Sequence, residues 1–222
     1  MSQFFSDKKV CIIGGSGALG SEIARKLLAK GAEVFLIART PANIPTDLSG
    51  VPFAQSDIRN RDGLRTAVAS FGCTFQGIVN AAGVVAFGSL SEVPEAVVRE
   101  LFEVNAQGTL NVLSIAPEFL DEGGIISSFS GVAADMELLN MSAYCSSKSA
   151  AKSAMKIAAR EFRSKKLSVL DVRAPHTETG LVDRALYGAA PKMPPGLTAS
   201  AVASRVLQAI EVGEKDLPAD AF

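Results

Sequence analysis

Short apolar runs rich in β-branched residues alternate along the chain with longer stretches whose apolar residues recur at helical spacing. The runs are typical of buried strands, and they cover residues 9–13, 33–38, 77–80, 124–128 and 167–172. The helical stretches lie between and after them, at residues 19–30, 61–71, 94–116, 143–163 and 199–212. This alternation predicts an α/β protein with a single doubly wound parallel sheet and helices on both faces.

The length of the chain bounds the number of domains. Its 222 residues lie near the upper end of what one α/β core holds. No linker, repeat or low-complexity stretch divides the chain. We therefore expect one domain over residues 1–222, with a cofactor-binding half over about residues 1–120 and a catalytic and substrate half over about residues 121–222.

Composition and charge exclude several classes of protein. The chain has 22 Lys and Arg against 23 Asp and Glu, so no broad basic field exists to attract nucleic acid or an anionic membrane. The cysteines Cys11, Cys73 and Cys145 are far apart, which indicates neither a disulfide framework nor a metal site. The apolar run at residues 10–13 is too short for a signal peptide or a membrane span. We expect a cytoplasmic protein that binds small molecules.

A glycine-rich turn follows the first predicted strand and precedes the first helix. Its residues are Gly14, Gly15, Ser16, Gly17, Ala18, Leu19 and Gly20. Glycine suits such a turn because the chain bends tightly and its backbone must approach a pyrophosphate at the helix N-terminus. Strand, glycine turn and helix together predict the dinucleotide site of a Rossmann fold.

The end of the second strand bears on the choice of cofactor. The acidic residue that would bind the ribose 2′-hydroxyl of NAD is missing there, and Arg39 stands beside its place. An arginine can pair with the 2′-phosphate of NADP, whereas a carboxylate would repel it. We expect NADP(H) to be preferred, with NAD(H) as the alternative if Arg39 only caps a solvated strand end.

Tyr144 and Lys148 lie four residues apart and hence on one face of a predicted helix. This spacing alone is also common on exposed helix faces. Taken with the glycine turn, Asn80-Ala81-Ala82-Gly83, Asn105 and the serines before Tyr144, however, it makes the chain similar to the short-chain dehydrogenase/reductase family. The resemblance covers almost the whole sequence.

The resemblance implies a role for each matching residue. Tyr144 would be the general acid or base, and Lys148 would lower the pKa of Tyr144 and hold the nicotinamide ribose. Asn105 would support a water-linked proton path to Lys148. The segment that would line the cofactor consists of Asn80, Ala81, Ala82 and Gly83, and the adenine would contact Asp57 and its neighbour Ile58.

The properties of the side chains support the same chemistry without the resemblance. A free phenol has a pKa near 10, so a nearby ammonium must stabilise the phenolate by about 1.4 kcal/mol for every unit of depression. In reduction Tyr144 would donate a proton to a carbonyl oxygen while a serine hydroxyl binds the same oxygen. Among Ser127, Ser128 and Ser130 we favour Ser130, which precedes Tyr144 by fourteen positions (144 minus 130).

A further segment, residues 173–180, resembles the one that flanks the nicotinamide in the family. Pro175, Thr177 and Thr179 would contact the cofactor. The segment departs from the family because His176 stands where glycine is usual and Thr179 comes one position early. As the only histidine, His176 is either a substrate contact or a replacement that the loop tolerates.

Three questions stay open at this level. The enzyme hypothesis, an NAD(P)-dependent carbonyl reduction or alcohol oxidation, competes with a non-catalytic NADP-binding redox sensor and with an epimerase or dehydratase that uses the cofactor transiently. The matching helices of the family form subunit interfaces, so the resemblance implies a homodimer or homotetramer. The substrate itself is not encoded, although mostly apolar candidate walls at residues 84–90, 132–140 and 181–197 suggest a medium-sized, partly apolar molecule.

Overall fold

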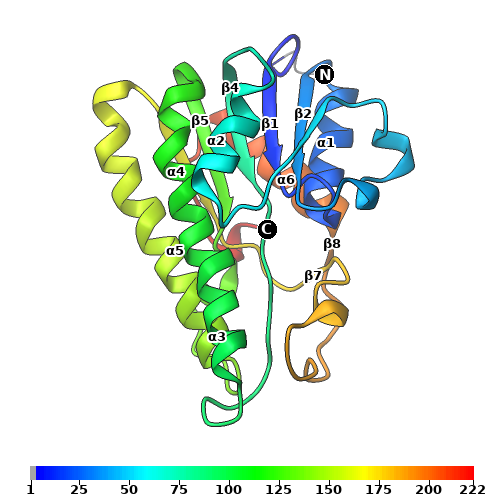
Figure 1. Ribbon diagram of the computed structural model, residues 1–222, viewed down its shortest axis with the longest axis vertical. Helices are drawn as coiled ribbons and strands as arrows, with labels where there is room; N and C mark the ends of the chain where they lie inside the picture. The colour runs from blue at the N-terminus through cyan, green and yellow to red at the C-terminus, as the bar shows by residue number, and fades with distance from the viewer. Residues whose placement is uncertain (1–3) are drawn as a thin grey trace.

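The computed structural model describes residues 4–222. Seven parallel strands form one sheet in the order β3-β2-β1-β4-β5-β6-β9 (Figure 1). The strands are β1 (Lys9–Ile13), β2 (Glu33–Ala38), β3 (Phe53–Gln55), β4 (Phe75–Asn80), β5 (Leu120–Phe129), β6 (Ser168–Val172) and β9 (Asp216–Leu217). The chain order reverses between β1 and β4, and ligands of doubly wound sheets bind at such a point, beyond the carboxyl ends of the strands.

Helices cover both faces of the sheet, as the sequence predicts (Figure 1). They are α1 (Ala18–Ala29), α2 (Arg61–Ala69), α3 (Glu95–Leu101), α4 (Gly108–Phe119), α5 (Ser142–Glu161) and α6 (Ala199–Val212). One core cluster packs α1 and α6 on the sheet through residues such as Ile23 and Val206. A second packs α2, α4 and α5 through Leu64, Ile115 and Met155. The predicted fold class is confirmed.

The helix expected over residues 94–116 is not continuous. Between α3 and α4 the chain forms a wider π-helical segment, η3 (Phe102–Gln107). Within it the Asn105 carbonyl accepts a hydrogen bond from Thr109 Oγ1 at 2.8 Å. π-helical turns occur often at functional sites, and this one contains a predicted catalytic residue.

Several short strands were not predicted from the sequence. They are β3, β7 (Thr177–Glu178), β8 (Leu197–Thr198) and β9. Strands of two or three residues are too short to show an alternation of apolar and polar positions. Two of these strands nevertheless shape the site, because β7 pairs with β8 and so joins the two ends of the segment at residues 179–196. The strand β9 adds the C-terminal segment to the edge of the main sheet, next to β6.

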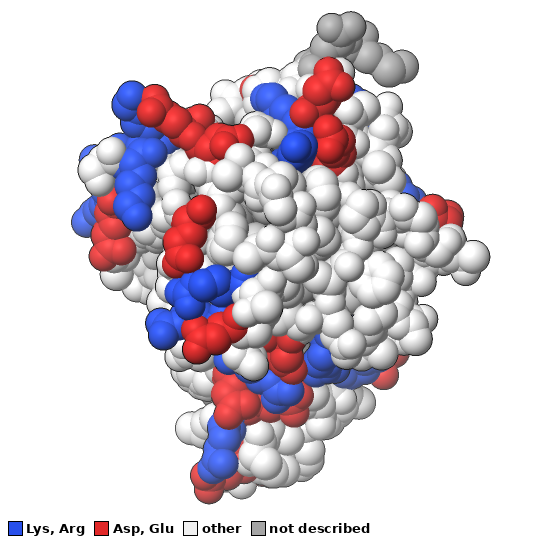
Figure 2. Space-filling view, turned by 45° about the horizontal axis from the view of Figure 1, so that its top comes forward, with Lys and Arg blue, Asp and Glu red and all other residues white. Residues whose placement is uncertain are grey.

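The surface carries charges of both signs. Figure 2 shows basic and acidic side chains next to one another on the face it displays, with uncharged surface between the groups. Within residues 4–222, none of the helices has the length and apolar character that a membrane span needs.

Candidate active site

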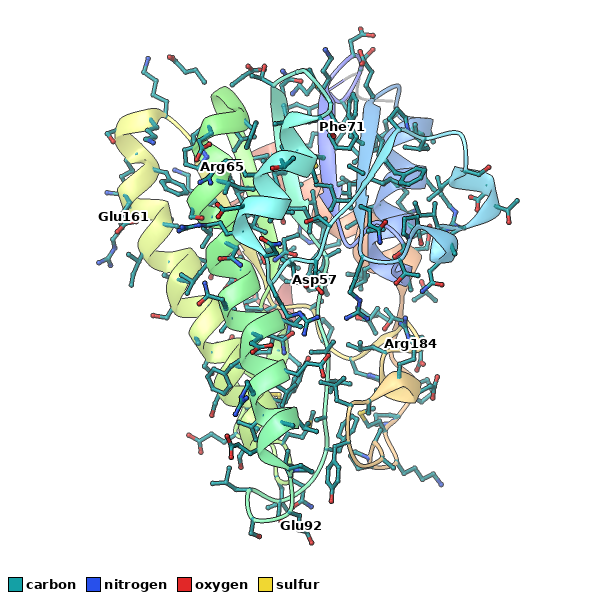
Figure 3. The ribbon with its side chains drawn as sticks, viewed as in Figure 1. Asp57, Arg65, Phe71, Glu92, Glu161 and Arg184 are labelled. Carbon is teal, nitrogen blue, oxygen red and sulfur yellow. The ribbon has the colours of Figure 1, made fainter. Side chains whose placement is uncertain are left out.

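A cavity of about 430 Å³ lies at the carboxyl ends of the central strands. Its wall combines the turn after β1, the end of β2, the segment after β4, the first turns of α5 and the segment after β6. In Figure 3, Asp57 lies below α2, and Arg184 lies across from it in η6 (Val182–Arg184); both residues line the cavity. This is the place at which the reversal in strand order predicts a ligand.

Most of the predicted site residues meet in this one cavity. Those that line it are Gly14, Ser16, Gly17, Ala18, Leu19, Arg39, Asp57, Ile58, Ala81, Ala82, Gly83, Tyr144, Lys148, Pro175, Thr177 and Thr179. The remaining five lie behind its wall, namely Gly15, Gly20, Asn80, Asn105 and Ser130. The structure therefore brings the predicted cofactor-binding residues and the predicted catalytic pair Tyr144 and Lys148 into one cavity, although these residues are far apart in the sequence.

The glycine turn has the shape that a bound pyrophosphate needs. Gly14 has a φ of +83°, and a Cβ there would lie 2.7 Å from the Ala82 nitrogen. A Cβ on Gly20 would overlap the Gly14 carbonyl oxygen. Gly17 precedes α1 without a side-chain cap, and the first turn of α1 has no acidic residue. The amide groups at this helix N-terminus are thus free to bind an anion.

The end of β2 presents a cation to the cavity. Arg39 lines it and forms no salt bridge within residues 4–222, although its charge acts on the nearby Asp57. The nearby carboxylate of Asp57 is already bound by Arg59, through Nη2 at 2.7 Å and Nε at 3.0 Å. Arg59 keeps the pKa of Asp57 below its ordinary value. The group available to a phosphate at this end of the cavity is therefore Arg39.

Two buried asparagines hold the cavity wall after β4. The Asn80 side chain donates to Ser128 Oγ at 3.0 Å and accepts from the Ala82 nitrogen at 3.2 Å. Asn105 binds both backbone groups of Val84, accepting from its nitrogen and donating to its oxygen, each at 3.0 Å. Because neither asparagine lines the cavity, their observed contacts are structural.

Tyr144 and Lys148 project from α5 into the cavity. Lys148 Nζ lies 6.0 Å from the centre of the Tyr144 ring and donates to the Phe129 carbonyl at 2.9 Å. Burial lowers the pKa of Lys148 to about 8, although Asp171 opposes this shift. Burial, with a smaller effect of Cys145, raises the pKa of Tyr144 to about 12. Burial thus moves the phenol further toward its protonated form, which a pKa near 10 already favours at neutral pH; the lowering that the resemblance implies for Tyr144 stays a prediction.

The hydroxyl of Ser130 points elsewhere. It donates to Asp171 Oδ1 at 2.5 Å, and Ser130 is 1% exposed and does not line the cavity. Ser128 accepts from Asn80, and the buried Ser127 hydroxyl has no hydrogen-bond partner in residues 4–222. The choice of Ser130 as the group that binds the substrate oxygen stays a prediction, and the contact with Asp171 bears directly on it.

His176 lines the cavity and also closes the base of the segment at residues 179–196. Its Nε2 lies 3.3 Å from Glu178 Oε1, which also accepts from the Gly196 nitrogen at 2.8 Å. The His176 carbonyl accepts from the Leu197 nitrogen at 2.9 Å. These contacts give the residue a structural task and leave its role toward a substrate as a prediction.

Several residues of the site were missed in the sequence. The cavity wall also includes Thr40, Asn43, Val104, Phe129 and Met141. Phe129 contributes its carbonyl to Lys148, and a backbone group has no sequence signature. The sequence did contain one signal of a polar contact here. Asp171 and Arg173 are charged residues in or beside a buried strand, and buried charges need partners.

Comparisons with known proteins agree with this geometry. A family model described as short chain dehydrogenase matches residues 8–187. L-xylulose reductase of Caenorhabditis elegans is 29% identical over 180 residues, 76% of this chain and 71% of that protein. The cyclic-di-GMP-binding biofilm dispersal mediator protein of Escherichia coli is 28% identical over 169 residues, 74% of this chain and 71% of that protein.

A solved structure also resembles this fold. It is the crystal structure of a short chain dehydrogenase from Burkholderia cenocepacia in complex with NADP. The TM-score is 0.86 at 24% identity, over 97% of this chain and 89% of that one. At this identity the likeness shows the fold, which agrees with the Rossmann topology of the sheet.

Proposed function

Because the chain belongs to the short-chain dehydrogenase family of oxidoreductases, we propose that it uses NADPH to reduce a ketone or aldehyde, with Tyr144 as the proton donor. The same groups serve the reverse oxidation of an alcohol by NADP⁺. One observation carries the proposal: Tyr144 and Lys148 line the same cavity as the glycine turn and Arg39. A small-molecule substrate and a dinucleotide would meet there.

The residues of the cavity fit NADP(H) along its length. The amides after Gly17 would hold the pyrophosphate, and Arg39 would bind the 2′-phosphate. The adenine would lie near Asp57 and Ile58, while the nicotinamide would be flanked by Pro175, Thr177 and Thr179. Support also comes from the Burkholderia cenocepacia relative, whose structure contains NADP. When bound, the cofactor supplies or accepts the hydride.

The chain itself handles the proton. With its pKa raised to about 12, Tyr144 keeps its proton at neutral pH and can give it to a carbonyl oxygen as negative charge develops there. Lys148, charged below a pKa of about 8, then stabilises the phenolate that is left. Both Lys148 and Asn105 approach Gly83, since a Cβ on Gly83 would lie 3.3 Å from Lys148 Nζ and 3.4 Å from Asn105 Oδ1. This convergence supports the proposed proton path from Asn105 to Lys148.

The remaining walls of the cavity suggest the kind of substrate. They include Phe87, Leu138, Met141 and Met193, with Arg184 as a charged group among them. A medium-sized, largely apolar carbonyl compound fits such a lining. We further propose a homodimer or homotetramer, because α4 and α5 pack side by side and Leu110 and Ile157 on them are 47% and 53% exposed. The free cysteines are compatible with the proposed cytoplasmic location.

A second candidate function is a sensor that binds NADP(H) without turnover. It is favoured by the similarity to the Escherichia coli protein named for cyclic-di-GMP binding and biofilm dispersal. Against it stands the Tyr144 side chain, which lines the cavity together with Lys148. An epimerase or dehydratase would use the same groups and differ in its products.

The test is oxidation of NADPH, followed at its absorbance band, with a panel of ketones and aldehydes. We expect the wild type to turn over some of them and Tyr144→Phe to lose that turnover while binding NADPH with unchanged affinity. Product analysis separates a reductase from an epimerase or dehydratase. If NADPH binds to both proteins and neither reduces any compound, the sensor is the better description.

A further inference from the structure

Arg184 lines the cavity, and the proposed reaction assigns it no step. It belongs to η6, in the segment at residues 179–196 whose two ends are joined by β7 and β8. The strand β8 leads directly into α6, which packs against α1, and Leu197 of β8 and Leu19 of α1 border the same core cluster. In Figure 3 Arg184 lies beneath α1, on the side of the cavity away from α5. It thus belongs to the end of the cavity at which the glycine turn leads into α1.

The backbone of its own segment holds the Arg184 side chain. Its Nε donates to the Gly180 carbonyl at 3.0 Å and its Nη2 to the Thr179 carbonyl at 3.4 Å. A guanidinium has five N–H donors in a fixed planar arrangement. Both donors of Nη1 and one of Nη2 therefore stay available for a ligand. Arg184 also forms no salt bridge within residues 4–222, so no carboxylate neutralises its charge.

The cavity has an excess of positive charge. Arg39, Lys148 and Arg184 line it, whereas the carboxylate among its lining residues, that of Asp57, is bound by Arg59. NADP(H) carries negative charge on its 2′-phosphate and on both phosphates of its pyrophosphate. Arg39 is the proposed partner of the 2′-phosphate, and the N-terminus of α1 contributes only about half an elementary charge to the pyrophosphate. The pyrophosphate thus lacks a full countercharge unless a second cation binds it.

We propose that Arg184 is this cation and binds the pyrophosphate of the cofactor together with the amides at the N-terminus of α1. The inference rests on the proposed use of NADP(H). Thr179, a predicted cofactor contact, adjoins the guanidinium through its carbonyl. Its hydroxyl oxygen accepts from the Leu181 nitrogen at 3.3 Å, which leaves the hydroxyl proton free for a phosphate oxygen. Two parallel N–H groups of an arginine match two phosphate oxygens, and such charged hydrogen bonds are strong.

An acidic group of a substrate is the competing partner for Arg184. The proposed proton donor Tyr144 and its neighbour Lys148 belong to α5, whereas β7 and β8 hold the segment of Arg184 against α6. The position of Arg184 therefore favours the cofactor over a group near the reacting carbonyl. Binding to the substrate is an outcome that the test below separates.

The test is calorimetric binding of NADPH, NADH and adenosine 2′-monophosphate to the wild type and to Arg184→Ala. Both dinucleotides contain the pyrophosphate, and the monophosphate keeps only the 2′-phosphate. We expect Arg184→Ala to weaken NADPH and NADH by about tenfold each and to leave the monophosphate unchanged. An equal loss for NADPH and the monophosphate would assign Arg184 to the 2′-phosphate and overturn the proposal. Unchanged binding of NADPH, with a KM that rises for keto acids and not for neutral ketones, would assign it to the substrate instead.

Ionic strength separates a charge contact from a structural effect of the substitution. Arg184 also binds two backbone carbonyls, so its loss could weaken NADPH binding by loosening the segment. Salt screens an exposed charge contact, and the ratio of the dissociation constants of variant and wild type should fall as salt is added. A ratio that does not depend on salt would show a structural role and overturn the proposal. Arg184→Lys, which keeps the charge without the planar donors, should recover part of the lost affinity.

The matched control is Lys192→Ala, which removes the same charge from the same segment at an exposed residue that does not line the cavity. We expect its affinity for NADPH to stay within about twofold of the wild type, because a solvated charge away from the ligand is screened. A loss as large as that of Arg184→Ala would exclude a specific contact. A wild type that binds neither dinucleotide would refute the proposed function itself, whereas equal dinucleotide binding by wild type and Arg184→Ala would refute only the role of Arg184.

Discussion

Lys148 is a buried cation, and its replacement by methionine should stabilise the protein while abolishing its proposed activity. The pKa of Lys148 falls from 10.5 to about 8 on folding, a difference of about 2.5 units (10.5 minus 8). At about 1.4 kcal/mol for each unit, burying the charge costs about 3 kcal/mol at neutral pH. The lost hydrogen bond to the Phe129 carbonyl offsets about 1 kcal/mol. We expect Lys148→Met to raise the free energy of unfolding by about 2 kcal/mol.

The sign of the pH dependence follows from the same shift. Below pH 8 Lys148 is charged in both the folded and the unfolded chain, so the penalty is fully present. Between about 8 and 10.5 the unfolded chain binds the proton and the folded one releases it, so the wild type gains stability as the pH rises. The advantage of Lys148→Met should therefore be largest at pH 7 and disappear near pH 10.5.

Urea unfolding at several pH values, followed by circular dichroism, measures this difference. The matched control is Lys152→Met, one helical turn further along α5, where the ammonium is paired with Asp135 and 23% exposed. We expect that variant to be no more stable than the wild type at any pH. A Lys148→Met protein that is less stable than the wild type at pH 7, or an advantage independent of pH, would refute the reasoning.

Three further predictions concern the cofactor and the assembly. Arg39→Ala should weaken NADPH binding by about tenfold or more and leave NADH binding unchanged in calorimetry, whereas equal losses for both cofactors would contradict a 2′-phosphate contact. Gly20→Ala should lower the midpoint of thermal unfolding, because its Cβ overlaps the Gly14 carbonyl oxygen. Gly17→Ala, whose Cβ lies 3.4 Å from the same oxygen, should keep the wild-type midpoint and weaken NADPH binding. Equal midpoints for the two variants would rule out this difference. Light scattering at micromolar concentration should give a dimer or tetramer that Ile157→Lys dissociates, and a monomeric wild type would disprove the proposed interface.

The strands and helices that lie in the core are those that the sequence predicted best. The bounds of β1, β2 and α6 agree with the predicted ones because most of their apolar residues lie in the core clusters. The strand β9 carries one fully buried apolar residue, Leu217, and its pairing with β6 supplies the rest of its order. Nor does a hydrophobic pattern distinguish a π-helical segment from an α-helix, since both bury similar faces.

In the site, too, the features that depend on local spacing were predicted, and those that depend on distant contacts were not. The glycine turn and the pair of Tyr144 and Lys148 each depend on a spacing of a few residues within one turn or helix, and both were found. Spacing also identified Ser130, but spacing reports only where its backbone lies. The direction of its hydroxyl depends on Asp171, 41 positions away, and on the register that sets Ser128 opposite Asp171.

The buried charges explain why a serine in the expected position need not have the expected contact. Burial raises the pKa of Asp171, the hydrogen bonds from Ser130 and Arg173 oppose that rise, and Arg173 in turn pairs with Asp216 of the last strand of the sheet. The hydrogen-bond partner of Ser130, the residue after β5, is thus held through Arg173 by a carboxylate of β9.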